Sequence, residues 1–129
     1  MTTIDIFNQP LFENNLEYYV SGEKIDLHND FDCTEILLKQ GNLSFEFRQL
    51  VKGTRVDLKF SYCKVLLARY ELSYLSRAVT LANLQRIRSE IKVGVLSDVS
   101  ASGERFFLIE FEEGQSIEVS ATGGELIIF

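Results

Sequence analysis

The stretch NLSFEFRQLVKGTRVDLKFSY, residues 42–62, decides the fold because its large apolar side chains recur at every second position. Polar residues fill the positions between them, which is typical of a β-strand with one buried and one solvated face. Gly53 divides the stretch and predicts a turn between two such strands. The apolar positions are Leu43, Phe45 and Phe47 before the turn, and Val56, Leu58, Phe60 and Tyr62 after it.

The segments around this stretch extend the β pattern. TEILLKQ, residues 34–40, precedes Gly41-Asn42, a pair that can close a hairpin and so predicts a three-stranded antiparallel meander. The C-terminal RFFLIEFEEGQSIEVSATGGELIIF, residues 105–129, predicts three strands separated by turns at Glu113-Gly114 and Gly123-Gly124. The closing LIIF is apolar on both faces, so we expect it to be an inner strand that ties the chain end into the sheet.

Two segments have helical character. In PLFENNLEYYVSG, residues 10–22, the apolar side chains cluster at spacings of about four, which predicts a short amphipathic helix. Residues 72–92 fit either a helix or a strand, and we expect a short helix or irregular crossing near 73–83, then a strand near 85–96. The predicted fold class is mainly β (α+β), an antiparallel sheet or small sandwich with one or two short helices. We expect residues 1–129 to form a single domain.

Composition limits the possible functions. A hydrophobic content of 46% excludes a disordered chain, and the net charge of −6 opposes binding to nucleic acid or to anionic lipid. The first residues contain no basic segment followed by an apolar run, and no apolar run is long enough to span a bilayer. We therefore expect a cytoplasmic protein in which Cys33 and Cys63 are reduced and buried.

The segment KIDLHNDFDCTEI, residues 24–36, contains the only histidine of the chain. His28 alternates with Asp26, Asp30 and Asp32, and such a set could bind a divalent metal if the segment were one continuous strand. Asn and Asp are depleted in strands, however, so His-Asn-Asp indicates a turn. The calcium-loop pattern also fails, because Phe31 stands where its glycine belongs. We favour a polar turn and predict no metal or other cofactor.

The residues give little support for catalysis. No Gly-x-Ser-x-Gly motif is present, and Cys33 is expected to point to the apolar side of its strand, away from His28. Glu110, Glu112 and Glu113 stand at the end of a predicted strand, where solvated carboxylates are common. We therefore expect that the protein is not an enzyme.

The strongest departure from an ordinary composition is the charge of the N-terminal region. Residues 1–35 contain eight carboxylates and one cation, Lys24. They could be the solvated face of the expected helix or an acidic patch that docks onto a basic protein. For the second case we predict these contact residues: Glu17, Tyr18, Glu23, Asp26, Asp30, Asp32 and Glu35. The alternatives are a β domain that binds a small molecule or metal, and a module that forms homo-oligomers.

The arrangement of segments resembles small bacterial proteins of the toxin-immunity type. An acidic turn runs straight into a strand at Phe31-Asp32-Cys33-Thr34-Glu35-Ile36, and the chain ends in a unit of the form FxIEFxxGxSIEVxA followed by LIIF. Several such families begin this strand with an aromatic-His-Asp-x-Glu-Ile motif. Here no His precedes Asp32, and one additional residue separates it from Glu35. The resemblance implies a protein that neutralises a basic toxin or enzyme by binding to it.

Overall fold

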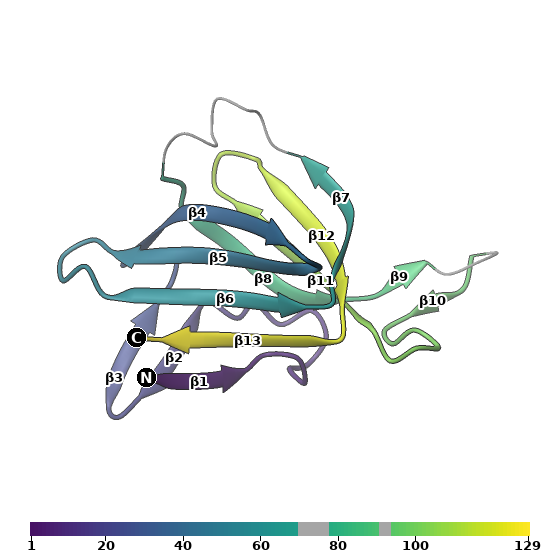
Figure 1. Cartoon of the computed structure of the whole chain (residues 1–129), viewed down its shortest axis with the longest axis horizontal. Helices are drawn as coiled ribbons and strands as arrows, with labels where there is room; N and C mark the ends of the chain where they lie inside the picture. The colour runs from purple at the N-terminus through teal and green to yellow at the C-terminus, as the bar shows by residue number, and fades with distance from the viewer. Residues whose placement is uncertain (70–77, 91–93) are drawn as a thin grey trace.

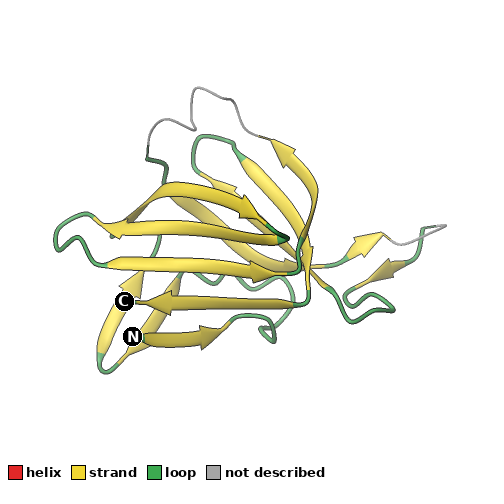
Figure 2. Ribbon diagram, in the orientation of Figure 1, coloured by secondary structure: helices red, strands yellow, loops and turns green. Residues whose placement is uncertain are grey.

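In a computed structural model of the chain, residues 1–69, 78–90 and 94–129 are described. All regular structure in these residues is β, and every strand pairing in the sheets is antiparallel (Figure 2). The expectation of a mainly β antiparallel protein is therefore confirmed. The described residues form no helix, so the expected helical part of the fold is not found among them.

The larger sheet contains the meander and the C-terminal strand. Its spatial order is β1 (Thr2–Asp5), β13 (Gly123–Ile128), β6 (Arg55–Ser61), β5 (Asn42–Gln49) and β4 (Phe31–Lys39). The hairpins β4–β5 and β5–β6 follow the sequence prediction, although the first turn is formed by Gln40 and Gly41, one residue earlier than expected. As predicted, the final strand is internal, lying between β1 and β6.

A second sheet packs against the first. Its order is β7 (Lys64–Arg69), β12 (Ser116–Ala121), β11 (Arg105–Phe111) and β8 (Leu81–Ile87). The two sheets share a corner, because β6 continues into β7 and β12 continues into β13 with the same register on both sides of the bend. At the bend Tyr62 has φ 48°, and the Thr122 N–H donates to the Ser61 carbonyl at 3.0 Å. Figure 1 shows both bent strands running through this corner.

The core fills the space between the two sheets. Phe45 and Phe60 of the larger sheet contact Phe111 and Phe107 of the smaller one, with ring centroids 6.2 Å and 5.0 Å apart. Away from the corner, the sheets are joined by a bridge between Cys33 and Val79, whose backbone bonds measure 2.7 and 3.0 Å. The inward positions predicted from the alternation are buried, except Tyr62, whose side chain is exposed at the corner.

The expected helix in residues 10–22 is wrong. The segment instead runs along the open edge of β8: the Phe12 N–H donates to the Arg86 carbonyl, and the Asn15 N–H donates to the Leu84 carbonyl. Asn14 Oδ1 accepts from the Leu84 N–H at 3.1 Å. Asparagine side chains compete with helical backbone hydrogen bonds, and here they help to satisfy a strand edge. The segment then forms β2 (Glu17–Val20), which pairs with β3 (Glu23–Asp26).

The predicted turn at Gly123-Gly124 is also wrong, because both glycines lie in β13 and the chain bends at Thr122 without reversing. In the ambiguous middle, 73–77 lies outside the described residues. The predicted strand near 85–96 is found only in part: β8 starts earlier, at Leu81, and is followed by β9 (Ser89–Glu90) and β10 (Leu96–Ser97). Figure 1 shows β9 and β10 extending away from the two sheets. Within the described ranges, no helix is long and apolar enough to cross a membrane.

Candidate functional site

The β2–β3 hairpin holds four of the predicted contact residues, Glu17, Tyr18, Glu23 and Asp26, in different environments. Tyr18 points into the core with 7% of its surface exposed, its hydroxyl donates to the Asn15 carbonyl at 2.9 Å, and burial raises its pKa to about 12. Glu17 is exposed and forms an ion pair with Lys24 at 3.3 Å. Glu23 is exposed at the turn, beside Lys24. Glu17 and Glu23 are thus available to a partner, whereas Tyr18 anchors the hairpin.

Asp26 organises the turn that follows. Its side chain is only 4% exposed, Oδ1 accepts from the backbone N–H groups of His28 and Asn29 at 3.1 and 3.0 Å, and Oδ2 accepts from Asn29 Nδ2 at 2.8 Å. Burial alone would raise the pKa of Asp26, but the hydrogen bonds from Asn29 and His28 and the charge of Lys24 together lower it below the usual value. The predicted turn at His-Asn-Asp is confirmed, and Asp26 is a structural part of it.

His28 connects this turn to the second sheet. Its Nδ1 lies 2.7 Å from the Leu81 carbonyl, which can only accept, so the proton is on Nδ1. Its Nε2 lies 3.4 Å from Glu112 Oε1. The Glu112 backbone N–H in turn donates to the Thr80 carbonyl at 2.9 Å. The sequence pattern indicates that Glu112, like Glu110 and Glu113, is a solvated carboxylate at a strand end, and only the pairing of distant strands places it beside His28.

The remaining predicted residues lie at or beyond the start of β4. Asp30 is exposed, and its carbonyl accepts from the Leu50 N–H at 2.9 Å. Asp32 is half-buried and accepts from Thr80 Oγ1 at 3.3 Å. Glu35 is exposed beyond a bulge in β4, opposite Glu46. His28 and Thr80 bring Glu112 and Asp32 together. Glu17 lies opposite Asp26 in the β2–β3 pair, and the Asp30 N–H donates to the Asp26 carbonyl at 3.0 Å. We call the four carboxylates next to this turn the acidic end: Glu17, Asp30, Asp32 and Glu112.

The two cysteines are buried and do not present a reactive thiolate at the acidic end. Cys33 points into the core, and burial raises the pKa of its thiol to about 12, so it is protonated at neutral pH. Cys63 is also buried, and both cysteines are free, as expected. The part of the chain that the structure describes contains no group of three or more His, Cys, Asp or Glu side chains arranged to hold a metal ion.

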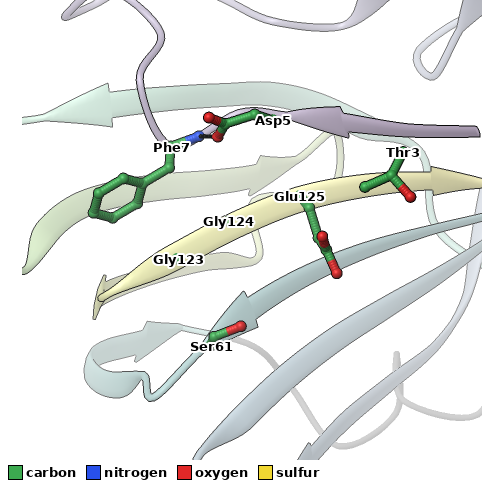
Figure 3. A pocket seen from close by; sticks show the side chains of 7 residues that line it. All are labelled: Thr3, Asp5, Phe7, Ser61, Gly123, Gly124 and Glu125. Atoms are coloured by element: carbon green, nitrogen blue, oxygen red, sulfur yellow. Dashed lines mark hydrogen bonds between the residues drawn. The ribbon is translucent and has the colours of Figure 1, made fainter.

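A shallow groove, drawn in Figure 3, lies over β1, β13 and the end of β6. It has a volume of about 440 Å³ and is lined by Thr3, Asp5, Phe7, Ser61, Gly123, Gly124 and Glu125. Asp5 and Glu125 are cross-strand partners in the β1–β13 pair, but their side chains point in different directions (Figure 3). The Asp5 oxygens already accept from the Phe7 backbone N–H and from Asn8 Nδ2, at 2.7 and 2.9 Å. This carboxylate is therefore engaged in the local turn.

The sequence matches no protein-family model, and no curated protein or solved structure matches it either. Function must therefore be inferred from the chemistry of the described residues.

Proposed function

We propose that this chain is a non-enzymatic, cytoplasmic binding protein of the inhibitor or immunity type, which docks its acidic end onto a basic surface of a partner protein. The observation that carries the proposal is the convergence of Glu17, Asp30, Asp32 and Glu112 around the His28 turn. Lys24 contacts Glu17 and Asp26, and His28 contacts Glu112. Arg48 stands opposite Asp32 in the β4–β5 pair and bonds to Glu46. The net charge of −6 adds long-range attraction for a basic partner.

The rigidity of the turn supports the same proposal. Asp26 is buried and accepts three hydrogen bonds, and Leu81 and Thr80 fix His28 and Asp32 from the other sheet. Charges held by such a framework lose little conformational freedom on binding, so more of their attraction contributes to affinity. Complementary charge of this kind chiefly increases the association rate and selects the partner.

The proposal is tested by capture of partners from a lysate of the source cells, at low and at moderate salt. We expect the wild-type protein to retain a basic protein at low salt and to release it as salt rises, since screening weakens contacts between exposed charges. The double variant Asp30→Lys/Asp32→Lys should retain little or none of it. Neither side chain is in the core, so circular dichroism should show an unchanged fold.

A matched control changes the net charge by the same amount elsewhere. Glu118→Lys/Glu125→Lys reverses two carboxylates on β12 and β13, away from the His28 turn. If capture depends on the acidic end, this control should retain the partner nearly as well as the wild type. Equal loss in both double variants would show that only net charge matters, and retention by Asp30→Lys/Asp32→Lys would refute the proposed surface.

A further inference from the structure

The outer edge of β4 carries a feature that the proposed function does not use. β4 is the last strand of the larger sheet, and its described cross-strand partner on the outer side is Val79, which bonds only to Cys33. The edge beyond the bulge, residues 35–39, has the sequence EILLK. Leu37 and Leu38 are 47% and 56% exposed, which is unusual for leucines in a strand. Exposed apolar edges of this kind readily pair with another strand.

We propose that the edge formed by residues 35–39 pairs with the same edge of a second copy, antiparallel, about a two-fold axis at Leu37. The sequence is complementary to itself in this register. Glu35 of one copy lies opposite Lys39 of the other, Ile36 lies opposite Leu38, and Leu37 meets its own copy. A two-fold interface repeats every contact, so both ion pairs and both apolar pairs form together.

Backbone geometry fits the same register. Lys39 pairs with Asn42 across the two-residue turn at Gln40 and Gly41, so its backbone groups face β5. Alternation along an antiparallel strand then turns the backbone groups of Ile36 and Leu38 toward the open edge. In the proposed register these two residues face each other across the axis and can exchange N–H···O bonds. The larger sheets of the two copies would become continuous.

The edge strand of the other sheet does not offer this fit. β7 also exposes apolar side chains, at Val65, Leu66 and Leu67, but it begins with Lys64 and ends with Arg69. Antiparallel pairing of two β7 strands over their full length would place Lys64 opposite Arg69 twice, and like charges directly opposite each other are unfavourable. Charge complementarity therefore favours β4 as the edge that a second copy occupies.

Sedimentation equilibrium of the purified chain, from micromolar to millimolar concentration, tests the proposal. We expect a concentration-dependent monomer–dimer equilibrium, since two short strands bury less surface than a standard stable interface. Glu35→Lys and Lys39→Glu each create two like-charge pairs and should raise the dissociation constant about tenfold. The double variant Glu35→Lys/Lys39→Glu restores opposite charges and should restore the wild-type constant. A monomer at every concentration, or a double variant weaker than either single variant, would refute the proposal.

A cross-link checks the position of the axis. Leu37→Cys would place two cysteines opposite each other with Cα atoms about 4.5 Å apart, within the range of a disulfide. Mild oxidation should therefore yield a covalent dimer, and the native Cys33 and Cys63 are buried and should not compete. Val51→Cys, in the exposed loop between β5 and β6, is the matched control. Equal cross-linking of the two variants would contradict an axis at Leu37.

Discussion

Asp26 shows that a carboxylate in an acidic segment can stabilise the fold instead of contacting a partner. It belongs to the residues that sequence pattern selected as partner contacts, yet it is buried and bonded to the backbone of the next turn. Neighbouring Asp30 has the same residue type, and its side chain is exposed. The alternation of charges along residues 24–36 is the same for both. They differ in the structure because the Asp26 carboxylate turns back onto the backbone of His28 and Asn29, whereas the Asp30 side chain is exposed.

Asp26→Ala should lower the free energy of unfolding by about 1–3 kcal/mol at pH 7, because two backbone N–H groups and the Asn29 amide lose a charged acceptor. The pKa of Asp26 is lowered in the folded state, so its stabilising effect is present above the unfolded pKa of about 3.9 and is lost as the pH falls through the folded pKa. The difference in urea unfolding between wild type and variant should therefore begin to shrink as the pH falls below about 3.9 and continue to shrink as the pH falls through the lowered folded pKa. A difference in unfolding free energy that stays constant at all pH values would contradict this role. Asp30→Ala is the control, because the Asp30 side chain is exposed.

The two cysteines give a second test at the residue scale. Burial raises the pKa of both thiols, that of Cys33 to about 12, so the reactive thiolate is scarce and shielded in the folded protein. At pH 8 we expect neither Cys33 nor Cys63 to react with an aromatic disulfide reagent until denaturant is added, after which both should react. Rapid labelling of the native protein would show that the strands carrying these residues open easily.

At the scale of elements, the two-residue repeat of apolar side chains predicted the strands well. The glycine and asparagine residues that usually mark turns predicted the strand ends less well. Alternation identified the β4–β6 meander and the β11–β12 hairpin, because each strand has one face in the core. Gly123 and Gly124 indicated a turn, but both lie in β13, where the backbone of Gly124 approaches the Ile6 side chain closely. The helical spacing in residues 10–22 gave a wrong prediction because this segment bonds to the open edge of β8 through its backbone and through Asn14. The local sequence does not show which strand edge is open to such a segment.

Gly124→Ala tests this close approach. A Cβ at Gly124 would lie 3.2 Å from Ile6 Cγ1 and 3.5 Å from Phe60 Cδ1, in the fully packed core. We expect this overpacking to cost about 1–3 kcal/mol of unfolding free energy. Gly123→Ala is the matched control, because its Cβ would meet Ser61 at an ordinary 3.5 Å and should change stability by less than about 0.5 kcal/mol. Equal urea midpoints for the two variants would contradict the packing described for β13.

At the scale of the molecule, the sequence predicted the mainly β, antiparallel character of the fold and the acidic character of the N-terminal third, but not how the parts converge. The packing of two sheets requires the bend at Tyr62 and Thr122, and no local signal distinguishes a bent strand from two strands and a turn. Glu112 joins the acidic end only because β11 and β8 bring it to His28. Glu23 and Glu35, in contrast, lie beside Lys24 and opposite Glu46 respectively, outside the acidic end.

The central claim is that the acidic end attracts a basic partner, and the association rate as a function of ionic strength tests it most directly. With the captured protein immobilised, the wild-type rate should fall steeply with added salt, since screening shortens the range of the attraction. Asp30→Lys/Asp32→Lys should associate at least about tenfold more slowly at low salt and with a much weaker salt dependence. Wild type and variant associating at the same rate, with the same salt dependence, would contradict the claim.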